Sequence, residues 1–135
     1  MITLLVVDDH SYLRAALVDL FNDTGDIQVV GECADGTEVV PAVQDTHPDV
    51  VLMDVDMPRM NGVEATRALR AIEPDAQVLM LTGTVSPVRI RQARALGAKG
   101  YVLKGEDPAE LIQRVREVAA GGTAWSGSVA EHLSA

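Results

Sequence analysis

Five polar residues of this chain stand directly behind short apolar segments: Asp8, Asp9, Asp54, Thr82 and Lys104. Carboxylates gathered in one place repel one another unless a cation neutralises them, and a hard divalent ion such as Mg²⁺ is the expected partner of oxygen ligands. Beside such a metal, a carboxylate can attack phosphorus, an ammonium can neutralise the transferring oxygens, and a hydroxyl can donate a hydrogen bond to one of them. Together, these residues predict phosphoryl-transfer chemistry.

Each of these residues taken alone has a simpler interpretation. Asp8 or Asp9 can cap a helix, Thr82 can be a polar residue at a strand end, and Lys104 can be a solvated charge. The chemical interpretation therefore depends on the fold bringing all five side chains to one place.

The apolar segments have the length and composition of buried strands. They do not alternate with polar residues, which is typical of strands that are covered on both faces of a parallel sheet. The five expected strands are Leu4–Val7, Ile27–Val30, Val50–Met53, Val78–Leu81 and Tyr101–Leu103. Because the carboxyl ends of parallel strands lie along one edge of a sheet, the polar residues that follow them are expected to meet there.

Helices are expected between these strands, because apolar residues recur there at helical spacing. The helical faces are marked by Leu13, Ala16, Leu17 and Leu20; Val39 and Val43; Ala65, Leu69 and Ile72; Ile90 and Ala93; and Leu111, Val115 and Val118. Strict alternation of strand and helix predicts an α/β fold with a doubly wound, five-stranded parallel sheet and right-handed crossovers. Pro41 falls inside the second helical segment, so a late start or a kink is expected there.

Composition narrows the class of protein further. The chain has 135 residues and a net charge of −9, and residues 1–60 hold 2 basic and 12 acidic groups. One domain is expected, and so strong an acidic balance disfavours nucleic-acid binding by this chain alone. Cys33 is the single cysteine and His10, His47 and His132 are scattered, so neither a disulfide nor a structural zinc site is expected. No apolar segment is long enough to span a membrane, and a cytoplasmic location is expected.

Residues 121–135 have the composition of a segment that leaves the domain. From Gly121 the sequence is rich in glycine and serine, which favours turns, and a short segment at Val129–Leu133 has helical potential. We therefore expect a domain over residues 1–120 and the start of a linker or a C-terminal tail over residues 121–135.

Four stretches of this sequence resemble the receiver domain of two-component response regulators. They are Leu5–His10, Val51–Gly62, Leu79–Gly83 and Gly97–Lys104, and the resemblance extends over about residues 2–120. It implies the flavodoxin-like (βα)5 fold with strand order 2-1-3-4-5. It also implies Mg²⁺-dependent phosphorylation by a sensor histidine kinase, with no enzymatic activity beyond the domain's own phosphoryl transfer and dephosphorylation.

The resemblance assigns a role to each acidic residue of the site. Asp54 is implied as the phosphoacceptor, Asp9 as a direct Mg²⁺ ligand, and Asp8 as a ligand acting through water. The backbone carbonyl of Asp56 is implied as the third protein ligand, while its side chain would face the phosphodonor or the hydrolytic water.

The resemblance also implies a conformational switch. Thr82 corresponds to the switch hydroxyl, Tyr101 to the switch aromatic, and Lys104 to the phosphoryl-binding lysine. Phosphorylation would draw Thr82 toward Asp54 and give Tyr101 room to turn. Gly105 stands where many relatives have proline, so the loop beyond Lys104 departs from the family pattern.

The residues that follow Lys104 are similar to those of regulators with a LuxR-type helix-turn-helix output domain. Such an output domain is absent from this chain, so we expect no specific DNA binding by it, although a full-length protein would regulate transcription. A phosphorylation-dependent homodimer is expected. Its expected surface lies on the fourth helix, which carries Arg89, Arg91 and Arg94, and on the fifth strand and fifth helix.

Two other functions deserve comparison with this one. Asp54-Val55-Asp56 after an apolar strand matches the nucleophile and acid pair of haloacid dehalogenase-type phosphatases, but that family carries the pair on its first strand. A degenerate receiver that serves only as an interaction surface would not need the complete set of acidic pair, acceptor, hydroxyl and lysine.

Overall fold

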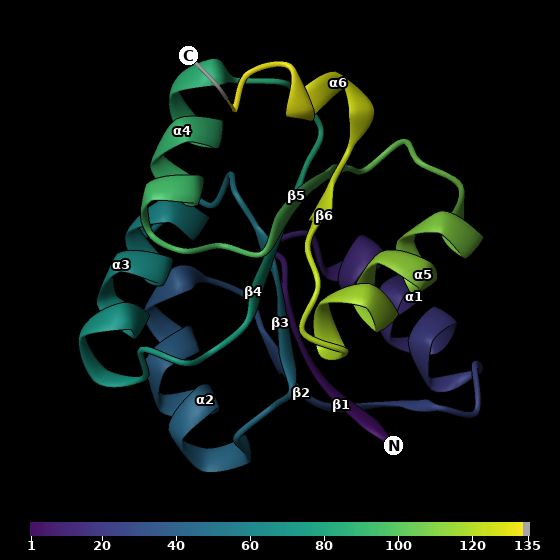
Figure 1. Cartoon of the computed structure of the whole chain (residues 1–135). Helices are drawn as coiled ribbons and strands as arrows, with labels where there is room; N and C mark the ends of the chain where they lie inside the picture. Colours follow the sequence, from purple (N-terminus) through teal and green to yellow (C-terminus); the bar gives the residue numbers. More distant parts are fainter. Residues whose placement is uncertain (134–135) are drawn as a thin grey trace.

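The computed structural model describes residues 1–133 as one six-stranded parallel sheet between two layers of helices. Figure 1 shows α2, α3 and α4 on one face of the sheet and α1 and α5 on the other. Within residues 1–133, no helix is long and apolar enough to cross a membrane. The strands are β1 (Ile2–Val7), β2 (Ile27–Cys33), β3 (Val50–Asp54), β4 (Val78–Thr82), β5 (Gly100–Leu103) and β6 (Ala124–Trp125). The helices are α1 (Ser11–Asn22), the short 3-10 helix η1 (Gly36–Glu38), α2 (Val39–Thr46), α3 (Gly62–Ile72), α4 (Pro87–Ala95), α5 (Pro108–Ala119) and α6 (Gly127–Ala130).

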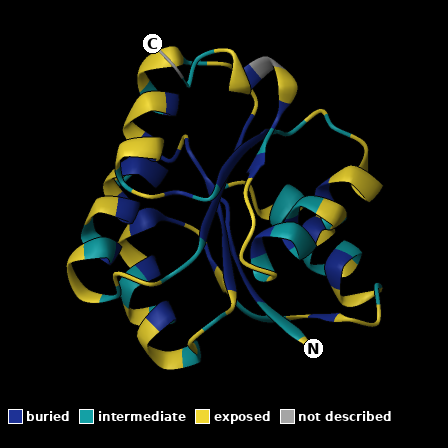
Figure 2. Ribbon diagram, in the orientation of Figure 1, coloured by how far each residue is buried: buried dark blue, intermediate teal, exposed yellow. Residues whose placement is uncertain are grey.

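The sheet order is β2-β1-β3-β4-β5-β6, which confirms the predicted order of the first five strands. Successive strand residues point to opposite faces, so the uninterrupted apolar segments supply two separate cores. Leu5 and Met53 pack under α2, α3 and α4, whereas Leu4 and Leu52 pack under α1 and α5. Figure 2 shows the strands buried and the outer faces of the helices exposed.

The helix starts agree with their sequence signals. Asn61 caps α3 through a reciprocal pair of hydrogen bonds with Glu64, and α4 and α5 begin at Pro87 and Pro108. The late start expected near Pro41 is confirmed, because η1 precedes α2 and the proline falls in the first turn of α2. A first-turn residue has no intrahelical partner for its N–H, so proline is tolerated there.

The expectation of five strands is incomplete, because residues of the expected tail add a sixth. In β6, the Ala124 N–H donates to the Lys99 carbonyl at 2.9 Å. A Cβ at Gly100 would lie 2.1 Å from the Ala124 carbonyl oxygen, so only glycine permits this close pairing. The C-terminal residues up to 133 therefore pack on the domain, while residues 134–135 of that tail lie outside the described part of the chain.

The short helix α6 continues this packing. It ends at Ala130, earlier than the helical segment expected at Val129–Leu133, and turns follow it. Val129 has no exposed surface and belongs to the same apolar cluster as Tyr101 and Ile90. In Figure 1 the yellow segment of β6 and α6 runs beside β5 toward the upper end of α4.

Candidate functional site

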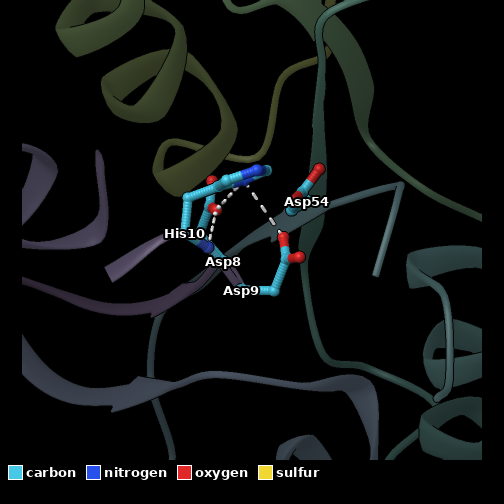
Figure 3. Close-up of side chains that lie close together, drawn as sticks. All are labelled: Asp8, Asp9, His10 and Asp54. Atoms are coloured by element: carbon cyan, nitrogen blue, oxygen red, sulfur yellow. Dashed lines mark hydrogen bonds and ion pairs between the residues drawn. The ribbon is translucent and has the colours of Figure 1, made fainter. Parts of the chain in front are cut away.

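The acidic residues predicted for the site come together at the carboxyl ends of β1 and β3. Asp8 and Asp9 follow β1, and Asp54 is the last residue of β3. Ligand atoms of these three residues and of His10 all lie within 4.8 Å of one another. Figure 3 shows the four side chains converging on one small region.

Two of these carboxylates are withdrawn from water without enough partners. Asp8 is 0 % and Asp54 is 1 % exposed. One oxygen of each, Asp8 Oδ2 and Asp54 Oδ2, is buried with no hydrogen-bond partner in the described structure, and so is Asp9 Oδ1. Lys104 and His10 lie within ion-pair distance of the Asp8 and Asp9 oxygens, whereas Asp54 Oδ2 has neither a hydrogen bond nor an ion pair in the described structure. A buried carboxylate oxygen without a partner is costly, and a hard cation relieves that cost. The donor set therefore fits Mg²⁺ by its chemistry.

Lys104, which follows β5, supplies a positive charge inside this cluster. Its Nζ lies 3.3 Å from Asp8 Oδ2 and 3.4 Å from Asp54 Oδ1. Burial, and after it the neighbouring Asp8 charge, raise the pKa of Asp54 to about 7, although Lys104 opposes both effects. One ammonium thus compensates only part of the charge of three carboxylates.

His10 is a member of the cluster that the sequence analysis did not assign to the site. Its Nδ1 lies 3.3 Å from Asp8 Oδ1 and 3.2 Å from Asp9 Oδ1. Its backbone N–H also donates to Asp8 Oδ1 at 2.9 Å, which holds the turn after β1. The ring itself is 68 % exposed. The sequence signal for this role was the position of His10 directly after Asp8 and Asp9. The sequence analysis considered only the spacing of the three histidines, which is too wide for a metal cluster.

The Asp56 side chain lies toward β4 and α4. The Asp56 N–H donates to Asp54 Oδ1 at 3.1 Å, so the loop after β3 contacts the candidate acceptor directly. Its exposed side chain lies 3.9 Å from Arg89 of α4 and accepts a long hydrogen bond, 3.5 Å, from Thr82. The Asp56 carboxylate therefore links the loop after β3 to β4 and α4.

Thr82 and Tyr101 lie on the neighbouring strands β4 and β5. Thr82 is the last residue of β4, and its hydroxyl accepts from the Thr84 N–H at 3.3 Å. Tyr101 is fully buried, and its hydroxyl has no hydrogen-bond partner of acceptable geometry within the described residues. Burial raises the pKa of Tyr101, and the nearby Thr82 hydroxyl lowers it by a smaller amount. The Tyr101 ring therefore lies inward, in the apolar cluster that also contains Ile90 and Val129.

The face that carries Tyr101 is partly covered by the C-terminal segment. The Ser126 N–H donates to the Tyr101 carbonyl at 3.2 Å, and Arg94 of α4 donates to the Leu133 carbonyl. Ser126 also donates through its hydroxyl to Glu106, two residues beyond Lys104. Sequence reasoning missed these contacts, because glycine and serine in this segment indicated turns and gave no sign of a partner.

Comparison with known proteins agrees with this geometry. The family model described as the response regulator receiver domain matches residues 4–116. The response regulator GacA of Pseudomonas viridiflava is 41 % identical over 137 residues, which cover 99 % of this chain and 63 % of GacA. The response regulator UvrY of Escherichia coli K12 is 36 % identical over 135 residues, which cover 99 % of this chain and 62 % of UvrY. The chain thus spans somewhat less than two thirds of the length of these relatives.

The similar solved structures are also response regulators. A LuxR-family two-component response regulator from Aurantimonas sp. SI85-9A1 superposes with a TM-score of 0.93 at 34 % identity, and the match covers 98 % of this chain and 95 % of that one. The isolated receiver domain of RcsB from Salmonella enterica serovar Typhimurium, solved with the phosphomimetic BeF3−, has a TM-score of 0.86 at 21 % identity, covers 98 % of each chain, and shares the fold. These matches favour a receiver over a haloacid dehalogenase-type phosphatase.

Proposed function

The chain belongs to the response regulator receiver domain family, and from that premise we propose that Asp54 is its phosphoacceptor. One observation carries the proposal: Asp54 is a buried carboxylate with an unpartnered oxygen, and both a carboxylate and an ammonium flank it. A structural aspartate in the core would be paired with donors. Asp54 instead has an oxygen without a donor, and it lies at the carboxyl end of β3, where the other site residues gather.

We assign the metal to the acidic side of the site. Asp9 and Asp54 would bind Mg²⁺ directly, Asp8 would act through water, and the backbone carbonyl of Asp56 would complete the protein ligands. When bound, the ion neutralises negative charge on the phosphoryl oxygens and on the carboxylates. The crowding of the three carboxylates and the unpartnered oxygen of Asp54 support this assignment.

The reaction is a transfer from the phosphohistidine of a sensor histidine kinase to Asp54. A carboxylate oxygen of Asp54 attacks phosphorus, the P–N bond breaks, and its electron pair stays on the imidazole of the kinase, which then takes up a proton. Lys104 neutralises charge on the transferring oxygens, and the Thr82 hydroxyl donates to one of them. Small acyl phosphates can donate in the same way. Hydrolysis of the acyl phosphate would be this domain's own reaction, with no turnover of other substrates.

Phosphorylation would bias the face formed by α4, β5 and α5. Thr82 would leave its long contact with Asp56 to donate to the phosphoryl group, and the buried position of Tyr101 would become the favoured one. Such a coupling is limited to about 1 to 3 kcal/mol, so the unphosphorylated domain would retain partial activity. Since β6 and α6 pack on this face, residues 124–133 would take part in the change.

The output of the switch is proposed to be association with a second copy of the domain. The LuxR-type regulators among the similar structures support a role in transcription for a longer protein containing residues 1–120 as its receiver. This chain alone would not bind DNA specifically, because its net charge is −9. We place its action in the cytoplasm, where the kinase domain of a sensor presents its phosphohistidine.

The proposal is tested by the intact mass of the protein after incubation with acetyl phosphate. The wild type is expected to gain one phosphoryl group in Mg²⁺ and none in EDTA, and Asp54→Asn is expected to gain none. Asp45→Asn changes an exposed aspartate of α2 and serves as the matched control. Undiminished labelling of Asp54→Asn would overturn the assignment.

A further inference from the structure

A second buried aspartate, Asp35, lies outside the acidic cluster and is not used by the reaction. It follows β2 and is 3 % exposed. Its Oδ2 accepts from the Thr37 N–H at 3.0 Å and from the Thr37 hydroxyl at 2.8 Å, which caps η1. Its Oδ1 accepts from two backbone groups far away in sequence, the Arg59 N–H at 3.3 Å and the Met60 N–H at 3.5 Å.

These two contacts fall in the second half of the loop that joins Asp54 to α3. The start of that loop is fixed by hydrogen bonds of Val55 to Leu81 and Gly62, and its end by the capping box of Asn61. Between them, over residues 57–60, the only hydrogen bonds in the described structure are those to Asp35. The Asp56 N–H, bound to Asp54, holds the first part of the loop, so the path of the chain from Asp56 to α3 depends on the contacts to Asp35.

The contact is reinforced by Gly36. A Cβ at this position would lie 2.3 Å from the Met60 carbonyl oxygen and 3.0 Å from its carbonyl carbon. Only glycine allows the turn after β2 to approach the loop so closely. The Asp35 carboxylate and the Gly36 backbone therefore hold the same short stretch, Arg59-Met60, from one direction.

We propose that Asp35 is a positioning residue for the phosphoacceptor site: by holding Arg59 and Met60 it sets the path of the loop that presents the backbone carbonyl of Asp56 to the metal. This inference rests on the proposed function, because Asp56 is a ligand only in that account. Asp35 touches neither the acidic cluster nor Lys104. Mutation of a group that orients a metal ligand without touching the metal commonly lowers the affinity for the metal by a factor of about ten or more.

The pKa of Asp35 agrees with this arrangement. Hydrogen bonds from Thr37 lower it most, and those from Met60 and Arg59 lower it further, so the carboxylate is ionised and acts only as an acceptor. Backbone N–H groups bound to a charged oxygen form stronger hydrogen bonds than those bound to a neutral one.

The two oxygens of Asp35 can be tested separately. Asp35→Ser keeps an N-cap residue for η1 but has too short a side chain to reach Arg59, whereas Thr37→Val removes one contact to Oδ2 and leaves both contacts to Oδ1. Gly36→Ala perturbs the loop without altering the carboxylate. Mg²⁺ affinity is measured by calorimetry on the full chain, and urea unfolding in EDTA gives the stability of each variant.

We expect the Kd for Mg²⁺ to rise roughly tenfold in Asp35→Ser and to rise in Gly36→Ala, but to stay within about twofold of wild type in Thr37→Val. Wild-type affinity in both Asp35→Ser and Gly36→Ala would overturn the inference, as would a Thr37→Val value raised as far as that of Asp35→Ser. Lower stability without a change in the Kd would assign Asp35 a purely structural role. If the wild type itself binds no Mg²⁺ and gains no phosphoryl group, the proposed function fails as well, which separates the two claims.

Discussion

Replacing Asp54 with asparagine should stabilise the metal-free protein at neutral and higher pH. The pKa of Asp54 is raised from 3.8 to about 7, first by burial and then by Asp8. The folded state therefore holds this proton more tightly than the unfolded state does. As the pH rises from about 4 to about 7, the folded state loses stability relative to the unfolded chain, and above pH 7 the loss is complete.

The size of this effect follows from the two pKa values. The difference between 3.8 and about 7 corresponds to about 4 kcal/mol of unfolding free energy. Asparagine removes that cost and can still accept from the Asp56 N–H, but it gives up the attraction to Lys104. We therefore expect Asp54→Asn to exceed the wild type by about 1 to 4 kcal/mol at pH 8, and by less than half of that gain at pH 5.

Urea unfolding in EDTA at pH 5 and pH 8 measures this gain. Asp19→Asn, which changes an exposed aspartate of α1, is the matched control and should stay within about 0.5 kcal/mol of wild type at both pH values. Mg²⁺ at pH 8 should stabilise the wild type more than Asp54→Asn and so reduce the difference. The reasoning is refuted if Asp54→Asn is no more stable than wild type at pH 8, or if its gain is as large at pH 5.

Three further predictions test other parts of the account. Lys104→Met should slow phosphorylation by acetyl phosphate roughly a hundredfold, because it removes the positive charge 3.4 Å from Asp54 Oδ1. The rate of mass gain measures this effect, and an unchanged rate would contradict the role of Lys104. Val129→Ala should cost roughly 2 kcal/mol of unfolding free energy and shift the emission of Trp125, the single tryptophan, toward that of an exposed indole; no change in either would mean that the C-terminal segment is not docked. Finally, retardation of DNA fragments by the chain should show no dependence on their sequence, and a promoter-specific shift would refute that expectation.

The sequence predicts the strands and helices of this molecule well, because the patterns that indicate them lie within short segments. The strands are apolar segments buried on both faces, so β3 and β4 were placed within one residue of their observed bounds. Pro41 marked the late start of α2 for a steric reason that acts within one turn. The gathering of Asp8, Asp9, Asp54 and Lys104 also follows from the strand ends alone.

The missed features depend on contacts between distant segments. Strand β6 is only two residues long, and its pairing depends on the room left by Gly100, which no local pattern of residues 121–126 reveals. Asp35 has no place in the predicted site, because its contacts to the loop after β3 are with backbone groups 24 and 25 residues away. The inward position of Tyr101 is likewise set by packing against α4 and α6.

The position of the phosphoryl group tests the central claim most directly. The wild type is incubated with acetyl phosphate and Mg²⁺ and then reduced with borohydride, which converts an aspartyl phosphate to homoserine, and peptides are sequenced by tandem mass spectrometry. The account predicts homoserine at position 54, absent when EDTA replaces Mg²⁺ and absent at every other aspartate. Homoserine at Asp8, Asp9 or Asp56 instead, or its formation at position 54 in EDTA, would contradict it.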